Sequence, residues 1–128
     1  MCQRADARCR SARPVALTTD SSFVTACAND LGIDGVFARQ VRALGRRGDV
    51  LFGISTSGES KNVPMAVAQP RVAQMAVVVL TGSDGRLAAT ADVAIRVPDE
   101  STAHLQENHL AIEHVICHIV ERQLHHRM

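Results

Sequence analysis

Residues 50–60 read VLFGISTSGES, and this stretch decides how the chain folds. Its first five residues are almost all apolar, which is typical of a strand in a parallel sheet that helices cover on both faces. A hydroxyl-rich loop follows at residues 55–60, and a helical pattern begins near Asn62. A strand that leads through a short loop into a helix is the repeating unit of parallel α/β sheets.

The loop at residues 55–60 is a candidate anion site. The first N–H groups of a helix have no partner within it, and the helix dipole adds partial positive charge there. Four hydroxyl groups add donors for a phosphate oxygen, those of Ser55, Thr56, Ser57 and Ser60. In the alternative interpretation, these hydroxyls only cap the helix and shape the turn. Glu59 disfavours a phosphate unless its carboxylate points away, and no GK[ST] sequence follows that would make this a Walker loop.

Short apolar runs alternate with helical patterns on both sides of this unit. They predict three more strands, at residues 15–18, 75–80 and 93–97, the last closed by Pro98. Together with residues 50–54, these strands predict an α/β fold in which helices flank a parallel sheet in three layers. The length of 128 residues suits one such domain.

Capping residues and helical spacing place the helices between these strands. Asp20, Ser21 and Ser22 offer N-caps for a first helix, and apolar residues recur at helical spacing over residues 36–44. In the helix that starts near Asn62, Pro70 would fall in the interior. Because an interior proline removes a hydrogen bond and clashes with the preceding turn, we expect this helix to kink or end near Gln69.

Composition excludes several classes of protein. Fourteen Lys and Arg against 13 Asp and Glu give a net charge of +1, so there is no general attraction to nucleic acid or to an anionic membrane. No apolar run approaches the ~20 residues of a membrane span. The four cysteines form no CxxC pair, which favours a protein of the reducing cytoplasm over a disulfide scaffold. Residues 1–13 are rich in arginine but no apolar segment follows, so they predict a poorly ordered lead-in to a domain at residues 14–128.

All six histidines lie in the last part of the chain. A helix over about residues 105–124 is apolar over a wide arc, which predicts burial in a core or between subunits. On it, His114 and His118 have the i, i+4 spacing of two metal ligands on one helical face. Such pairs are frequent by chance, so solvated histidines are the alternative. The other four are expected to be surface or interface residues: His104, His109, His125 and His126.

Residues 49–63, DVLFGISTSGESKNV, resemble the sugar-isomerase (SIS) fold and, within it, the phosphoheptose isomerase family. Residues 26–41, 80–85 and 102–114 agree with this resemblance, which runs in register over about residues 13–124. It implies a flavodoxin-like parallel sheet. It also implies the conversion of sedoheptulose 7-phosphate to D-glycero-D-manno-heptose 7-phosphate, an aldose–ketose isomerisation that feeds bacterial heptose and lipopolysaccharide synthesis. Family members are zinc-containing homotetramers whose sites lie at subunit boundaries.

The resemblance also implies site residues. The substrate-binding residues are Asn29 and Asp30 for the sugar, Ser55, Thr56, Ser57 and Ser60 for the phosphate, and Gln106. Gln106 and His114 match a pair that holds zinc in the family, and His114 is also the candidate catalytic acid or base. The chemistry needs such a group, because a proton must move between adjacent sugar carbons.

Spacing limits how Gln106 and His114 can share one metal ion. Eight residues of straight α-helix rise ~12 Å, and helical side chains lean toward the N-terminus. The two side chains therefore reach one ion only if Gln106 lies at or just before the first turn. Thr102 as N-cap, or an irregular turn after it, would permit this.

The chain departs from the family pattern at its start. Members carry a first strand, a Gly-rich loop with serine, and a helix whose His and Glu supply metal ligands and a catalytic group. Residues 1–13 contain no Gly and cannot supply that loop, and the missing strand belongs between residues 15–18 and 50–54. We therefore expect an N-terminally truncated or degenerate member, or a start site placed too late, whose incomplete active site binds phosphosugar with little turnover.

Two other interpretations stay open. Some SIS proteins bind a replication-initiator protein and isomerise nothing, so the chain would be a non-catalytic module that binds a phosphosugar or that initiator. Those relatives typically lack the late helical histidine, so His114 favours isomerase ancestry. In the other interpretation, the chain is an unstable fragment without activity.

Overall fold

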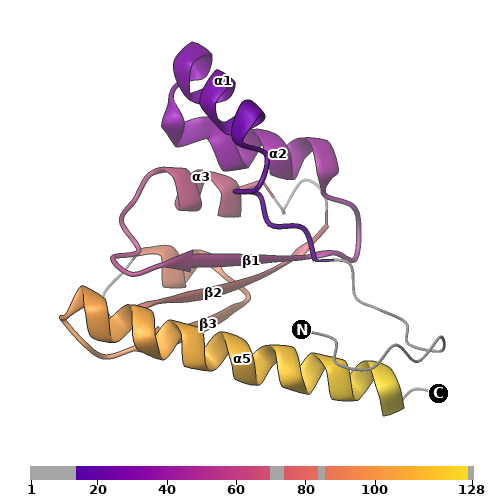
Figure 1. Ribbon diagram of the computed structural model, residues 1–128, viewed down its shortest axis with the longest axis vertical. Helices are drawn as coiled ribbons and strands as arrows, with labels where there is room; N and C mark the ends of the chain where they lie inside the picture. The colour runs from indigo at the N-terminus through magenta and orange to yellow at the C-terminus, as the bar shows by residue number, and fades with distance from the viewer. Residues whose placement is uncertain (1–13, 70–73, 84–85, 127–128) are drawn as a thin grey trace.

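Three parallel strands form the sheet, in the order β1–β2–β3 (Figure 1). They are β1 (Val50–Ser55), β2 (Ala76–Gly82) and β3 (Val93–Val97). These strands confirm three of the four that the sequence predicts. The computed structural model describes residues 14–69, 74–83 and 86–126, so the expectation for residues 1–13 lies outside the described residues.

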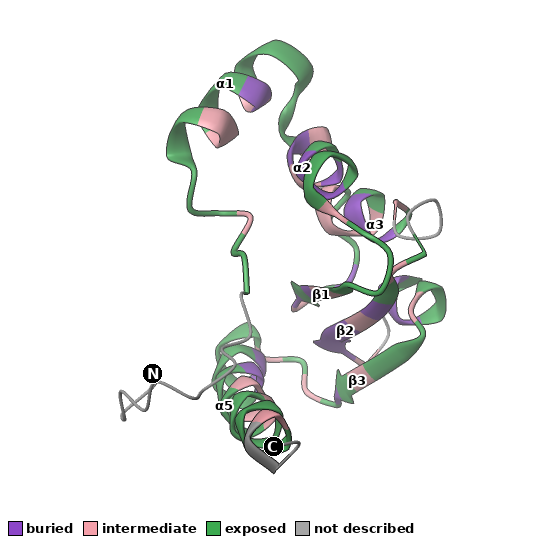
Figure 2. Cartoon of the chain, turned by 90° about the vertical axis from the view of Figure 1, so that its right-hand side faces the viewer, coloured by how far each residue is buried: buried purple, intermediate pink, exposed green. Residues whose placement is uncertain are grey.

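Helices lie on both sides of this sheet, as predicted for a three-layer α/β fold (Figures 1 and 2). One side carries α2 (Val36–Leu44) and α3 (Asn62–Val67), and beyond them α1 (Ser21–Leu31) and the 3-10 turn η1 (Ile33–Gly35). The other side carries the long α5 (Thr102–His126), and a second 3-10 turn, η2 (Arg86–Thr90), joins β2 to β3. None of the helices described is both long and apolar enough to cross a membrane.

The strand register brings the carboxyl ends of all three strands to the same end of the sheet, which we call its carboxyl edge. Ser55 at the end of β1 pairs with Thr81 of β2, and Gly82 at the end of β2 pairs with Val97 of β3. The segments that leave the three strands therefore emerge next to one another. This edge is where open parallel α/β sheets bind their ligands.

Each face of the sheet packs against its own apolar cluster. The cluster on the α3 side consists of Val67, Val77, Val79 and Leu87, and that on the α5 side of Leu80, Val97 and Leu105. Strand β2 contributes to both clusters, because successive side chains of a strand point to opposite faces. It is also the most deeply buried strand (Figure 2). Helices α3 and α5 are therefore anchored to the same strand from opposite sides.

Residues 15–18 do not form the strand that the sequence predicts. The chain turns here, because the N–H and the hydroxyl of Thr19 both donate to the Ala16 carbonyl, at 3.3 and 2.8 Å. Nε2 of Gln40 donates to the Leu17 carbonyl at 2.8 Å, which ties the segment to α2. An apolar run becomes a strand only beside a partner strand, and among the described residues β1 pairs with β2 alone.

Among the described residues, β1 is the outermost strand of the sheet, and the prediction that helices cover both its faces is wrong. Val50 is 60% exposed and Ile54 is 43% exposed. Both share a face with Phe52, which packs on the α5 side of the sheet. Helix α5 packs mainly on β2 and β3, so the face of β1 that carries Val50 and Ile54 stays partly exposed.

Local signals predict the ends of the short helices correctly. Asp20 caps α1, since its Oδ1 accepts a hydrogen bond from the Phe23 N–H at 2.9 Å. Helix α3 ends at Val67, and Ala68 already lies in a turn, as expected for a helix that cannot continue into a proline. Pro70 itself lies outside the described residues.

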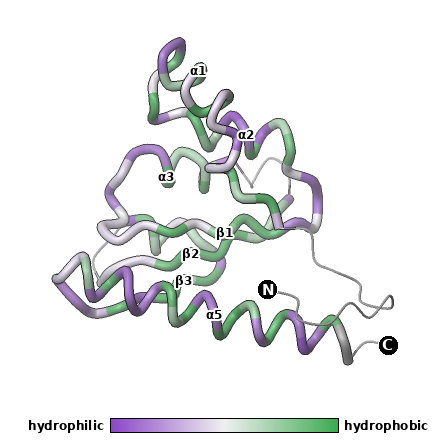
Figure 3. Tube along the Cα trace, in the orientation of Figure 1, coloured by the Kyte–Doolittle hydropathy of each residue, from purple (hydrophilic) through white to green (hydrophobic). Residues whose placement is uncertain are grey.

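The last helix is longer than predicted and only partly covered. It begins at Thr102, and Leu105 donates its N–H to the carbonyl of Ser101 at 2.9 Å, so Ser101 precedes the helix and Thr102 is not the N-cap. Apolar residues continue along α5 beyond the sheet (Figure 3). Several of them are exposed in the single chain: Leu110, Val115, Ile119 and Val120. The prediction of burial in the core is therefore wrong for this part of α5, and burial between subunits stays a prediction.

Gly82 allows the loop after β1 to approach the end of β2. A methyl group on this residue would lie 2.6 Å from the carbonyl oxygen of Thr56. Gly82→Ala must push the loop away, so we expect it to lower the free energy of unfolding by about 1–3 kcal/mol, as overpacking does. Urea unfolding monitored by circular dichroism measures this change. Gly35→Ala is the matched control, because no atom lies within 4 Å of its methyl position. Equal losses in both variants would contradict the role of Gly82.

Candidate functional site

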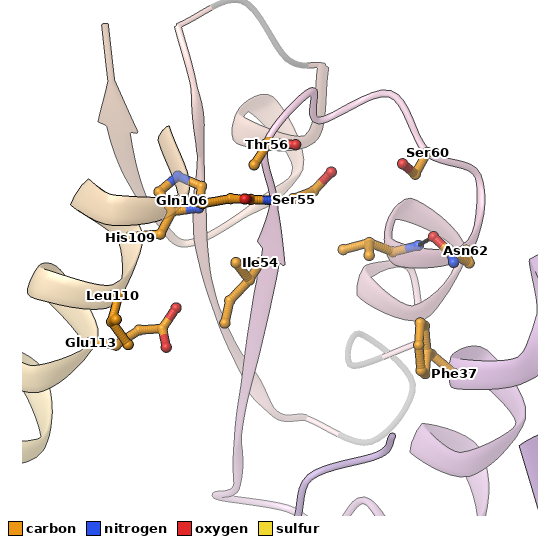
Figure 4. A pocket seen from close by; sticks show the side chains of 11 residues that line it. Phe37, Ile54, Ser55, Thr56, Ser60, Asn62, Gln106, His109, Leu110 and Glu113 are labelled. Atoms are coloured by element: carbon orange, nitrogen blue, oxygen red, sulfur yellow. Dashed lines mark hydrogen bonds between the residues drawn. The ribbon is translucent and has the colours of Figure 1, made fainter. Parts of the chain in front are cut away.

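A cavity of about 550 Å³ lies at the carboxyl edge of the sheet, between the loop after β1 and helix α5 (Figure 4). Its size is typical of small-molecule sites. Its polar lining includes Ser55, Thr56 and Ser60 from the loop and Gln106, His109 and Glu113 from α5. The structure therefore brings four of the predicted site residues together, three hydroxyls and the Gln106 amide.

The loop at residues 55–60 is shaped by its own hydroxyls. Oγ of Ser55 accepts a hydrogen bond from the Gly58 N–H at 3.1 Å, and Oγ of Ser57 accepts one from the Glu59 N–H at 3.2 Å. Gly58 has a φ of 65°, the left-handed region that favours glycine. The turn-shaping role is thus confirmed for two of the hydroxyls. A hydroxyl that accepts such a bond keeps its own proton to donate, so the loop still offers donors to an anion.

Ser57 faces a second, smaller cavity on the other side of Thr56, with a volume of about 320 Å³. Asp99 lines this second cavity, and Oδ2 of its carboxylate lies 3.3 Å from Nδ1 of His104. A hydrogen bond from the Ser101 N–H is the main cause that holds the pKa of Asp99 below its ordinary value. Two acidic residues line this smaller cavity, Asp99 and Glu100, whereas Glu113 alone lines the larger one, so the larger cavity is the better place for a phosphate.

The carboxylate of Glu59 is bound by Arg86 and lines neither cavity. Nη2 of Arg86 lies 2.7 Å from Oε2 of Glu59, and the Arg86 N–H donates to Oε1 at 3.3 Å. The hydrogen bond from the Arg86 side chain lowers the pKa of Glu59, and the same bond raises the pKa of Arg86. The carboxylate of Glu59 thus points away from the larger cavity, so it does not oppose a phosphate bound by the loop hydroxyls.

Three polar residues of α5 face the larger cavity at positions i, i+3 and i+7. They are Gln106, His109 and Glu113, and this spacing returns to the same helical face. His109 is only 3% exposed, so the prediction that it is a surface or interface residue is wrong. The signal that could have found it is its position one turn after Gln106 on the same face. Figure 4 shows both side chains on the α5 side of the cavity.

Asn29 and Asp30 lie apart from this cavity. Both are exposed at the carboxyl end of α1, and neither lines the cavity. Helices α1 and α5 lie at opposite ends of the molecule (Figure 1). The single chain does not bring these two residues to the phosphate loop, so their contact with a sugar stays a prediction.

Gln106 and His114 do not meet in the single chain. Because α5 begins at Thr102, Gln106 lies beyond its first turn, and the eight residues to His114 rise ~12 Å. His114 is exposed and does not line the cavity, and His118 is also exposed. The part of the chain that the structure describes holds no group of three His, Cys, Asp or Glu residues placed to bind a metal ion. The residues of one chain therefore do not fit the zinc ion that the resemblance implies.

Sequence comparison assigns the chain to a family. Residues 7–82, more than half of the chain, match the SIS domain family, so the chain belongs to it. The chain is 52% identical over 114 residues to the phosphoheptose isomerase of Neisseria gonorrhoeae and 50% identical over 114 residues to that of Coxiella burnetii. Each alignment covers 86% of this chain, but only 58% and 57% of those relatives. The chain thus spans less than two thirds of their length.

Solved structures of phosphoheptose isomerases have the same fold. The enzyme from Neisseria gonorrhoeae superposes with a TM-score of 0.81 at 52% identity, over 84% of this chain and 61% of that chain. The enzyme from Francisella tularensis gives a TM-score of 0.81 at 40% identity, over 86% of this chain and 62% of that chain. These matches confirm the predicted fold class and the resemblance to the phosphoheptose isomerase family.

The contact between Glu59 and Arg86 makes stability depend on pH. Since the pKa of Glu59 in the folded chain lies below its ordinary value of 4.5, the pair stabilises the fold above that pH, and the stabilisation is lost as the pH falls through the lowered pKa. We expect Glu59→Gln to lower the Tm slightly at about pH 6, because exposed pairs contribute little, and to lower it less at about pH 3, because protonation of Glu59 weakens the pair. Thermal melts at both values measure this. The control is Glu107→Gln, at an exposed position of α5, and the same pattern in both variants would count against the pair.

Proposed function

We propose that this protein binds a phosphorylated sugar in the larger cavity and is a homologue of the isomerases that convert sedoheptulose 7-phosphate to D-glycero-D-manno-heptose 7-phosphate. The observation that carries the proposal is the loop at residues 55–60, whose hydroxyls line a cavity at the carboxyl edge of a parallel sheet. About 50% identity to phosphoheptose isomerases supports the choice of substrate.

The cavity supplies groups for each part of such a substrate. Phosphate oxygens accept hydrogen bonds only, and the hydroxyls of Ser55, Thr56 and Ser60 donate them. On the facing wall, Gln106 offers an amide that both donates and accepts, which suits the hydroxyl groups of a sugar.

Isomerisation also needs a group that moves a proton between adjacent carbons. We assign this role to His114, as the family pattern implies. In one chain His114 is exposed and outside the cavity, so the assignment requires a second chain that brings its own α5 to the site. The exposed apolar residues of α5, Leu110 and Val115 among them, support a homo-oligomer, and we propose a tetramer. Gln106 and His114, which the family pattern also assigns to zinc, do not meet in one chain, so a zinc site would need a second chain as well.

Composition supports the remaining parts of the proposal. We place the protein in the cytoplasm and assign it no nucleic-acid or membrane partner. The near-neutral charge supports this assignment, and so do Cys27 and Cys117, which are both free thiols.

Ser60 tests the phosphate site with little structural disturbance. Its side chain lines the cavity and is exposed, and its hydroxyl makes no hydrogen bond to another described residue. We expect Ser60→Ala to weaken binding of sedoheptulose 7-phosphate about tenfold, the loss of one hydrogen bond to a charged group. Isothermal titration calorimetry measures the Kd. Ser22→Ala, at an exposed serine of α1, is the control, and an unchanged Kd in Ser60→Ala would refute the proposed phosphate site.

Turnover tests the catalytic part of the proposal. We expect the 128-residue chain to bind sedoheptulose 7-phosphate but to isomerise it slowly, with or without added zinc, because it spans only 57–58% of the length of the isomerases that it matches. A coupled assay of the aldose product measures the rate. Rates like those of the full-length isomerases would overturn the expectation, whereas binding without any turnover would favour a non-catalytic phosphosugar-binding module.

A further inference from the structure

His109 carries a buried polar atom whose partner is missing. Among the described residues, two buried side-chain atoms have no hydrogen-bond partner, the Thr81 hydroxyl and Nε2 of His109. Thr81 lies within β2 and lines neither cavity, whereas His109 is 3% exposed and lines the larger one. A buried polar atom without a partner costs about 1–3 kcal/mol. The atom itself is buried, but its residue lines the cavity, so a ligand toward which the imidazole ring turns can supply the missing partner.

The two walls of the cavity differ in charge and in hydrogen-bonding chemistry (Figure 4). The loop wall offers hydroxyl donors, which suit a phosphate. The α5 wall carries the carboxylate of Glu113, which repels a phosphate. A bound sugar phosphate therefore places its phosphate at the loop and its hydroxyl groups toward α5, where Gln106 and His109 lie.

We propose that His109 is a substrate-binding residue of this cavity and that its Nε2 forms a hydrogen bond with a hydroxyl group of the sugar. The inference rests on the proposed function, because it takes a phosphosugar as the ligand. An imidazole nitrogen donates in one tautomer and accepts in the other, and a sugar hydroxyl does both. Gln106 precedes His109 by one turn and Glu113 follows it by one turn, so the three form a polar strip along the path of the sugar.

This placement gives His109 a part in selecting the ligand. Inorganic phosphate fills only the loop side and leaves Nε2 of His109 without a partner. A sugar phosphate fills both sides and supplies that partner. His109 therefore distinguishes a phosphorylated sugar from phosphate alone, which the loop hydroxyls cannot do.

Nuclear magnetic resonance of the complete 128-residue chain tests the contact directly. With ¹⁵N-labelled histidine, the Nε2 signal of His109 is identified by its loss in His109→Gln. We expect sedoheptulose 7-phosphate to shift this signal and inorganic phosphate to leave it in place. The signal of His118, which is exposed on the same helix, is the internal control and stays unchanged with both ligands.

Two substitutions test the contribution to affinity. We expect His109→Leu to weaken binding of sedoheptulose 7-phosphate about tenfold, and His109→Gln, which keeps a polar nitrogen, to weaken it less. Binding of inorganic phosphate should stay within about twofold in both variants, because the loop is unchanged. His118→Gln is the matched control. Should the buried substitutions prevent folding, sequential assignment of the uniformly labelled chain identifies the His109 signal, and its shift in the unmodified chain still decides.

The outcomes separate this inference from the proposed function. If the unmodified chain binds sedoheptulose 7-phosphate but the Nε2 signal of His109 does not move, the inference is wrong and the proposed function stands. An equal shift with inorganic phosphate, or an equal loss of affinity for both ligands, also overturns it. If the chain binds no sedoheptulose 7-phosphate, the proposed function is wrong, and the proposed hydrogen bond between His109 and the sugar is wrong as well.

Discussion

The hydrogen bond from the Gly82 N–H to the Thr56 carbonyl, at 3.1 Å, is the contact on which the site depends. It continues the pairing of β1 and β2 one step past the last paired residues, Ser55 and Thr81. The loop after β1 therefore leaves the sheet at a fixed point, with two cavities on its two sides. Glycine is required at position 82 because a side chain there would occupy the space of the carbonyl oxygen.

Strand β2 connects this contact to the two walls of the larger cavity. Val79 faces the cluster that holds α3, and Leu80 faces the cluster that holds α5 through Leu105. Leu105 is the neighbour of Gln106, so the packing that secures the helix also sets the direction of its polar strip. The cavity-lining side chains of α5 therefore owe their positions to the core and not to the loop alone.

Local and distant interactions explain which features the sequence predicts. The strand at residues 50–54, the cap at Asp20 and the end of α3 follow from neighbouring residues, and the structure confirms them. The strand predicted at residues 15–18 is absent because a strand needs a partner that its own four residues cannot specify. The hydroxyls that line the cavity can be predicted from the sequence, because they follow a predicted strand directly. The burial of His109 depends on how α5 is rotated about its axis against the sheet, and the spacing of residues alone does not determine that rotation.

The open edge of β1, beside which no strand pairs among the described residues, offers a surface for pairing with another molecule. Such an edge presents unpaired backbone groups that accept a strand from another molecule, and the exposed Val50 and Ile54 add apolar surface beside it. Ile54 and Ser55 also line the larger cavity. A strand from a second molecule that paired with β1 would therefore lie beside this cavity, which makes the open edge and the cavity neighbouring parts of one surface.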